Sequence, residues 1–223
     1  MGHVRRLIAF DLDGTLIDSR RDLTDSVNLL ITGRGGAPLS EAAVSRMVGE
    51  GARVLVRRAL EAAGLEDAPG SMTRFLEIYD TRLLNHTRAY DGIADAVQAA
   101  REHGRVAVLT NKPAEPTRKI LDGLGLLDLF HDVVCGDGPL PRKPDPASLV
   151  ALMDGAGVEP SQALMVGDSL IDHETAQRAS ARCCMAAYGY GYLTFPKRRL
   201  TGEEWVAESP ADVTRAIEEF RAG

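Results

Sequence analysis

Short runs of apolar residues recur along the chain without the polar alternation of a half-exposed strand. The runs are Leu7–Phe10, Val106–Leu109, Val133–Cys135, Ala163–Val166 and Cys183–Ala186, and the shorter pair Trp205–Val206 fits a sixth. Runs of this length are typical of strands that a parallel sheet buries on both faces. From residue 93 onward, segments with helical spacing separate the runs. This alternation predicts a doubly wound, Rossmann-like α/β core with helices on both faces of a parallel sheet.

The stretch between the first two runs has a different pattern. Apolar residues such as Leu23 and Val27 recur there at helical spacing, and no convincing strand interrupts them. We therefore expect a helical cap domain at residues 17–87, inserted into a core formed by residues 1–16 and 88–223.

Four of the predicted strands carry charged or hydrogen-bonding residues just beyond their carboxyl ends. These are Asp11 and Asp13 after the first strand, Thr110 and Asn111 after the second, Lys143 in the loop after the third, and Asp168 and Asp172 after the fourth. Parallel strands run in one direction, so these residues should gather at one edge of the sheet. In open α/β sheets, this is the edge that binds ligands.

The predicted edge combines an excess of carboxylates with one lysine. Carboxylates as close as Asp11 and Asp13 repel each other unless a cation or a proton separates them, and Mg²⁺ takes oxygen ligands of this kind. The lysine, the Thr110 hydroxyl and the Asn111 amide call instead for an anion. A metal-bound phosphate satisfies both requirements, and Gly14 permits the backbone to approach it closely.

Lysine is rare in this chain, because only four of its 26 basic residues are lysines. A lysine at position 143 therefore suggests that the site needs a compact point charge. Lys112 has a weaker case, and we interpret it as a surface or loop-packing residue.

Composition and charge narrow the classes of function and partner. The 223 residues are 44% hydrophobic, carry a net charge of −6 and have a pI near 5.4, which argues against nucleic-acid binding. No apolar run approaches the roughly 20 residues of a membrane span, and no signal-peptide pattern is present. The odd number of cysteines, with Cys183 and Cys184 adjacent, does not resemble a disulfide framework. We expect a cytoplasmic protein with buried strand thiols; whether these thiols have a redox role, and whether the protein is a monomer or a homodimer, stays open.

Four motifs in order resemble those of the haloacid dehalogenase-like superfamily, phosphatase branch. They are Asp11-Leu12-Asp13-Gly14-Thr15, Thr110-Asn111, Lys143-Pro144 and Gly167-Asp168-Ser169-x-x-Asp172, and the resemblance covers nearly the whole chain. Three further stretches are similar to bacterial phosphoglycolate phosphatases, namely Val48–Ala52, Arg57–Leu60 and Leu109–Pro113. The resemblance also places a mobile cap at residues 17–87, with the chain crossings at 16–19 and 90–92 as hinges.

The resemblance implies roles for the carboxylates. Asp11 would be the nucleophile that forms an aspartyl-phosphate, and Asp13 would act as general acid and then as general base. Asp11, the backbone carbonyl of Asp13 and Asp168 would bind Mg²⁺, and Asp172 would orient these ligands without touching the ion. Asp168 must then lie beside Asp11, so the first strand should be central, between the second and the fourth.

The remaining site residues would bind the substrate. Lys143 would neutralise charge on the phosphoryl oxygens and hold the nucleophile. Thr110 and Asn111 would donate hydrogen bonds to the phosphate, and backbone N–H groups around Gly14 would complete the cradle. In the cap, the loop at 49–53 precedes a helix N-terminus, where Arg53 is a candidate partner for a substrate carboxylate. An ordinary helix–helix turn with a solvated arginine explains that loop at least as well.

Together these features predict Mg²⁺-dependent hydrolysis of a small phosphomonoester, with 2-phosphoglycolate favoured. A phosphatase acting on a sugar phosphate or a nucleoside monophosphate is an alternative. A phosphomutase would need a basic cluster in the cap, which the sequence does not show. A phosphonate hydrolase would need a cap lysine, and residues 17–87 contain none. A non-enzymatic sensor of phosphometabolites would be expected to lack Asp11 or Asp13.

Overall fold

The computed structural model describes residues 6–222 and contains one six-stranded sheet. The first five residues of the predicted core segment 1–16 and the final Gly223 lie outside the described residues. In sequence order the strands are β1 (Leu7–Phe10), β4 (Arg105–Leu109), β5 (Asp132–Val134), β6 (Ala163–Gly167), β7 (Arg182–Ala186) and β8 (Trp205–Ala207). Their order across the sheet is β5-β4-β1-β6-β7-β8, and every neighbouring pair is parallel. The predicted doubly wound sheet is confirmed.

Strand β1 lies at the centre of the sheet, where the direction of winding reverses. Its last residue, Phe10, pairs with Val108 of β4 on one side and with Val166 of β6 on the other. The predicted neighbours of the first strand are therefore correct. A crevice at such a switch point, beyond the carboxyl ends of the strands, is the usual ligand site of this architecture.

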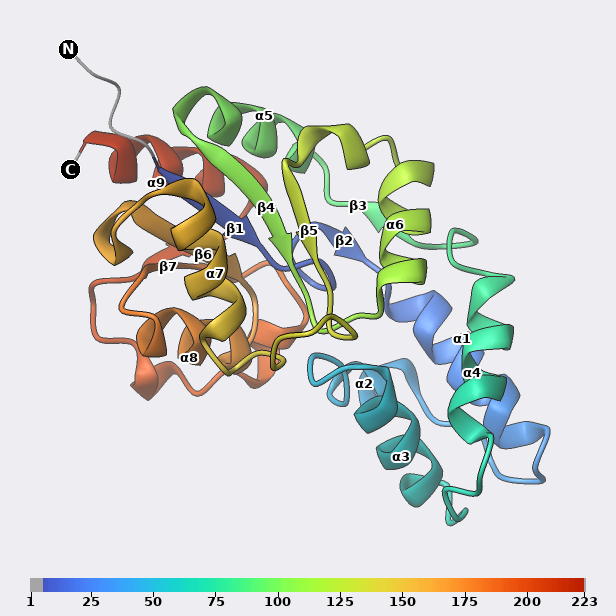
Figure 1. The fold of residues 1–223 in the computed structure, drawn as a ribbon. Helices are drawn as coiled ribbons and strands as arrows, with labels where there is room; N and C mark the ends of the chain where they lie inside the picture. The colour runs from blue at the N-terminus through green and yellow to red at the C-terminus, as the bar shows by residue number, and fades with distance from the viewer. Residues whose placement is uncertain (1–5, 223) are drawn as a thin grey trace.

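Helices cover both faces of the sheet, and the strand side chains alternate between them (Figure 1). Helices α5 (Ile93–His103), α6 (Ala114–Gly123) and α9 (Pro210–Ala222) pack on one face, and α7 (Ala147–Ala156) and α8 (Leu170–Arg178) pack on the other. In β1, Ile8 and Phe10 join the first hydrophobic cluster, whereas Leu7 and Ala9 join the second. Burial on both faces explains why these strands lack polar alternation.

A second group of helices lies beyond the carboxyl edge of the sheet (Figure 1). It consists of α1 (Arg20–Thr32), α2 (Glu41–Ser45), α3 (Ala52–Ala62) and α4 (Ser71–Asp80), and we call it the four-helix segment. Where the chain enters and leaves this segment, β2 (Ile17–Asp18) pairs antiparallel with β3 (Arg88–Ala89). These two-residue strands were not predicted, because two residues show no periodicity.

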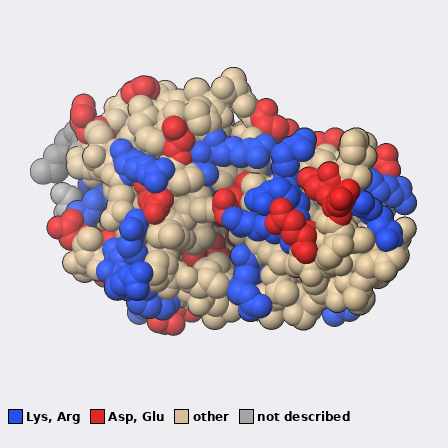
Figure 2. Space-filling view, turned by 90° about the horizontal axis from the view of Figure 1, so that it is seen from below, with Lys and Arg blue, Asp and Glu red and all other residues tan. Residues whose placement is uncertain are grey.

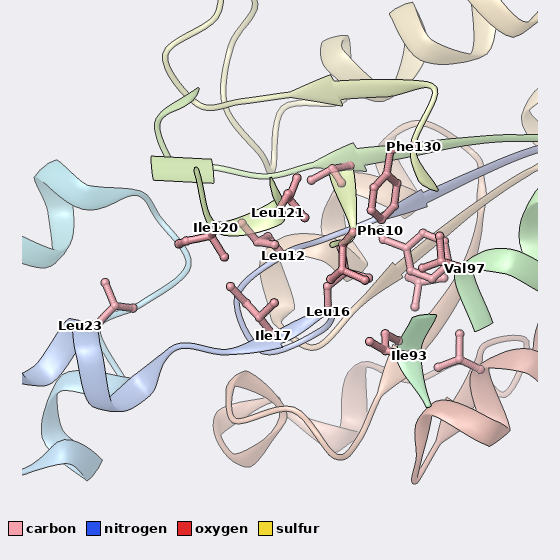
Figure 3. Packing of buried hydrophobic residues seen from close by; sticks show 14 of the residues in the cluster. Phe10, Leu12, Leu16, Ile17, Leu23, Ile93, Val97, Ile120, Leu121 and Phe130 are labelled. Atoms are coloured by element: carbon pink, nitrogen blue, oxygen red, sulfur yellow. The ribbon is translucent and has the colours of Figure 1, made fainter. Parts of the chain in front are cut away.

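The turn after β1 is anchored by buried apolar side chains. Leu12, Leu16 and Ile17 have no exposed surface and pack near Ile120 and Leu121 of α6 (Figure 3). Leu12 lies between the two aspartates of the first motif. Its burial in the core fixes the backbone on either side of it, which positions the carboxylates at the sheet edge.

Short 3₁₀ helices complete the described structure at Leu127–Leu129, Pro160–Gln162, Gly191–Thr194 and Lys197–Arg199. Within residues 6–222 we find no helix whose length and apolar character would let it cross a bilayer. On the face drawn in Figure 2, basic side chains are interleaved with acidic ones. A continuous basic face, as is typical of nucleic-acid binding, is not visible there.

Candidate active site

Three buried carboxylates meet at the carboxyl edge of the sheet. Asp11 follows β1, Asp168 follows β6, and Asp172 lies in the first turn of α8. One oxygen from each carboxylate lies within 4.8 Å of the others, and this is the only such group of potential metal ligands in the described part of the chain. Asp11, Asp168 and Asp172, which the sequence predicts at one edge of the sheet, lie close together there.

Lys143 provides one positive charge to this cluster. Its Nζ lies 2.8 Å from Oδ1 of Asp11 and 2.6 Å from Oδ1 of Asp172, and its side chain is 2% exposed. Two carboxylates thus share one ammonium group, while the carboxylate of Asp168 adds a third negative charge. The cluster keeps an excess of negative charge in a region of low dielectric.

Burial, together with this excess of negative charge, raises the pKa values of two aspartates. Burial, followed by the charge of Asp172, raises the pKa of Asp11 to about 7, although Lys143 opposes the shift. Burial and then the neighbouring carboxylates likewise raise the pKa of Asp168 well above its usual range. A bound cation would offset the repulsion that adds to the effect of burial in both shifts. The residues present therefore fit a metal ion, and a buried, oxygen-only donor set is one that Mg²⁺ accepts.

Hydrogen bonds hold the three carboxylates in place. Oδ2 of Asp172 accepts from the backbone N–H of Ser169 at 3.0 Å and from its hydroxyl at 2.6 Å, which caps α8. Oδ2 of Asp168 accepts from the backbone N–H of Gly191 at 2.7 Å. Both oxygens of Asp172 are thus occupied by protein donors, whereas Asp168 keeps one oxygen without a protein partner among the hydrogen bonds found.

Glycines let the backbone pass close to Asp168. Gly14 has φ +92°, and a Cβ placed on it would overlap the carboxylate of Asp168. A Cβ on Gly189 would overlap the Gly14 carbonyl and the same aspartate. The missing side chain of Gly14 therefore lets the turn after β1 approach Asp168 at the end of β6.

Asp13 lies apart from the three buried carboxylates and has its own partners. Its Oδ1 accepts a hydrogen bond from the Ser19 hydroxyl at 2.5 Å, and both of its oxygens lie 3.1 Å from Nζ of Lys112. Lys112 is 7% exposed, so its interpretation as a surface residue was wrong. It follows β4, which neighbours β1, and its side chain returns to the sheet edge instead of leaving it. The rarity of lysine, which favoured Lys143, was the signal that should have been applied to Lys112 as well.

The two other predicted phosphate ligands are both buried at this edge. Oγ1 of Thr110 accepts from the backbone N–H of Lys112 at 3.2 Å. The side-chain amide of Asn111 donates to the carbonyl of Gly49 at 2.9 Å and to that of Lys143 at 2.9 Å. Asn111 therefore joins the four-helix segment to the core with its side chain.

A small cavity of about 40 Å³ lies between the core and the four-helix segment. The core contributes Asp11, Asp13, Thr110, Asn111, Lys112, Pro113 and Pro116, and the segment contributes Leu23, Val48, Gly49, Gly51, Ala52, Leu55, Phe75, Leu76 and Tyr79. Arg53 is exposed and is absent from this lining. The loop predicted to face the substrate therefore reaches the cavity through its glycines, while its arginine does not. Tyr79 of α4 is part of the cavity wall.

Known proteins are similar to this chain in sequence and in fold. A phosphoglycolate phosphatase from Rhodospirillum rubrum is 47% identical over 194 residues, which cover 83% of this chain and 80% of that protein. Phosphoglycolate phosphatase 1 of Pseudomonas aeruginosa is 40% identical over 195 residues, or 84% of this chain and 71% of that one. The crystal structure of a predicted phosphoglycolate phosphatase from Haemophilus somnus superposes with a TM-score of 0.87 at 30% identity, covering 95% of this chain and 97% of the other.

A family model for haloacid dehalogenase-like hydrolases matches residues 5–180, which include all four sequence motifs. The parallel sheet, with its aspartates after β1 and β6, agrees with that match. The chain belongs to the haloacid dehalogenase-like hydrolase family.

Proposed function

We propose that the protein is a Mg²⁺-dependent phosphatase that hydrolyses 2-phosphoglycolate. The convergence of Asp11, Asp168 and Asp172 around Lys143 carries this proposal, because it combines a nucleophile, a cation site and a counter-charge for phosphate. The relatives named phosphoglycolate phosphatase support the choice of substrate. We also propose that the reaction takes place in the cytoplasm, which agrees with three free cysteines.

The reaction proceeds in two steps that leave the protein unchanged. A carboxylate oxygen of Asp11 attacks the phosphorus atom, the ester P–O bond breaks, and Asp13 donates a proton to the departing glycolate oxygen. Water then attacks the phosphorus of the aspartyl-phosphate and transfers a proton to Asp13. Inorganic phosphate leaves, and the carboxylate of Asp11 is restored.

Asp11, Asp168 and the backbone carbonyl of Asp13 would hold the Mg²⁺ ion in this proposal. When bound, the ion neutralises negative charge between the nucleophile and the phosphate. Lys143 contributes a second positive charge to the phosphoryl oxygens, and Asp172 keeps it in position. Asp172 itself stays outside the metal ligands, because both of its oxygens already accept hydrogen bonds.

Backbone groups and short side chains bind the phosphate. The Thr110 hydroxyl and the backbone N–H of Asn111 lie at the carboxyl end of β4, beside the nucleophile. The turn at Gly14 adds further N–H groups. Residues 17–87 form the cap in this proposal, and the paired strands β2 and β3 mark its hinge.

A phosphate-release panel tests the proposal directly. The purified chain would be assayed with 2-phosphoglycolate, sugar phosphates and nucleoside monophosphates, each with Mg²⁺ and with EDTA. We expect the highest kcat/KM for 2-phosphoglycolate and no turnover in EDTA. Preference for a sugar phosphate or a nucleotide would contradict the proposed substrate. Dependence on a bisphosphate activator would indicate a phosphomutase. A lack of turnover with every substrate would contradict the proposed phosphatase activity.

A further inference from the structure

Lys112 carries the only positive charge among the described residues that line the cavity. Its ammonium group lies 3.1 Å from both oxygens of Asp13, and it lies 4.8 Å from the ring centre of Tyr79 in α4. One contact is made within the core and the other is made with the four-helix segment. Lys112 thus occupies the boundary at which the leaving group of a substrate would sit.

Tyr79 supplies a second donor to the same cavity. The residue is 2% exposed, and its hydroxyl interacts with the ammonium group of Lys112, which can only donate; within residues 6–222 the O–H group has no acceptor. Leaving a buried hydroxyl donor without an acceptor is unfavourable. Its ring stacks on Phe75 with centroids 5.6 Å apart and an interplanar angle of 16°, so its position is fixed by packing. An unpaired donor held rigidly in a cavity wall points to a missing ligand group.

The protonation states of both groups suit an anion. Burial raises the pKa of Tyr79 to about 12, although Lys112 opposes the shift, so the phenol stays neutral and can donate. Lys112 carries a positive charge, which attracts an anion strongly in a cavity of low dielectric. An ammonium group has three donors, so it can serve Asp13 and a ligand at once.

The remaining walls restrict the ligand to a small one. Much of the four-helix side is apolar, with Leu55, Phe75 and Leu76 among its residues. The hydroxyls of a sugar would lose their hydrogen bonds against these side chains, which is unfavourable. The volume of about 40 Å³ holds only a few water-sized groups. A compact anion satisfies the two donors without placing further polar groups against the apolar wall.

We propose that Lys112 and Tyr79 bind the carboxylate of the substrate and so select phosphomonoesters that carry a carboxylate beside the ester carbon. This inference rests on the proposed function, and it assigns substrate selection to a core lysine and an α4 tyrosine instead of Arg53. Lys112 also contacts Asp13, so its loss would slow the hydrolysis of every phosphomonoester to some extent. Selection of a carboxylate is therefore visible only in a comparison of two substrates.

A matched pair of substrates separates these effects. 2-Phosphoglycolate would be compared with 2-hydroxyethyl phosphate, in which a neutral hydroxymethyl group replaces the carboxylate. The measured quantity is the ratio of the two kcat/KM values for the unaltered chain and for Lys112→Gln, Lys112→Arg and Tyr79→Phe. The control is Lys197→Gln, which removes an exposed lysine outside the cavity lining.

We expect Lys112→Gln to reduce this ratio about 10- to 100-fold, because a charge-assisted hydrogen bond is lost. Tyr79→Phe should reduce it about 3- to 10-fold, Lys112→Arg should retain most of it, and Lys197→Gln should leave it unchanged. Equal losses for both substrates in Lys112→Gln, or an unchanged ratio in Tyr79→Phe, would overturn the inference and leave the proposed function intact. If the unaltered chain does not prefer 2-phosphoglycolate, the inference and the proposed substrate both fail.

Discussion

At the scale of one residue, the buried carboxylate of Asp11 lowers the stability of the metal-free protein at the position that the proposed reaction requires. Its carboxylate is buried beside two others, and burial raises its pKa from 3.8 to about 7. Without a cation, the folded protein therefore binds more protons than the unfolded chain between these pH values. The contribution of Asp11 to stability falls as pH rises through this window and levels off above it.

We predict that Asp11→Asn stabilises the metal-free protein. The amide mimics the protonated carboxyl group, and Lys143 keeps Asp172 as its partner. In EDTA the gain should be small near pH 4 and should reach about 1–3 kcal/mol above pH 7, a discounted value from about 1.4 kcal/mol per pKa unit. Urea unfolding at several pH values measures it. Asp67→Asn, at an exposed loop position, is the control, and an equal or larger gain in that variant would contradict the argument.

Sequence reasoning located most of the site residues but not their partners. Asp11 and Asp168 were identifiable because they follow apolar runs, and parallel strands share an edge. The contact between Lys112 and Asp13 was not, because the direction of a side chain beyond a strand end depends on the turn that follows. Asn111 was predicted to bind phosphate, yet its amide joins two loops that are distant in sequence.

At the scale of elements, a buried carboxylate connects the four-helix segment to the returning chain. Asp22 of α1 is 1% exposed, and its Oδ2 accepts from the backbone N–H of His86 at 2.9 Å. The same oxygen accepts from the backbone N–H and the hydroxyl of Thr87, each at 2.8 Å. These contacts lie next to the paired strands β2 and β3. They fix the two crossings relative to each other.

We predict that Asp22→Asn loosens the four-helix segment. Oδ1 of Asp22 also accepts from the backbone N–H of His86, at 3.1 Å. In the asparagine an NH₂ group takes the place of one of the two oxygens and faces a backbone N–H, which costs about 1–3 kcal/mol. Hydrogen exchange should accelerate in α1–α4 before it accelerates in β1. Asp25→Asn in the same helix removes a partly exposed partner of Arg21 and should cost less than about 1 kcal/mol. Equal effects of the two substitutions would contradict the role given to Asp22.

The helices of this segment were predictable from their spacing, whereas β2 and β3 were not. Thirteen residues in α1 repeat the apolar period several times, but a two-residue strand shows no period at all. Its existence depends on pairing with residues 88–89, far along the chain. Short elements that only tertiary contacts stabilise therefore escape sequence patterns.

At the scale of the whole molecule, a rigid sheet carries the chemistry and a helical segment covers it. The alternating strands and helices predicted the core, and the motif resemblance supplied the central position of β1. The placement of the four-helix segment over the carboxyl edge follows from contacts that no local pattern contains, such as Asn111 with Gly49. The cavity between the two parts is consequently a property of the folded molecule.

The central claim is that Asp11 accepts the phosphoryl group at a cation site built from buried aspartates. Mass spectrometry of protein quenched in acid during turnover of 2-phosphoglycolate tests it most directly. The account predicts a phosphoryl group on the peptide that contains Asp11, formed with Mg²⁺ and absent in EDTA and in a folded Asp11→Asn variant. Phosphate release that continues in Asp11→Asn, or turnover with no phosphorylated aspartate, would contradict it.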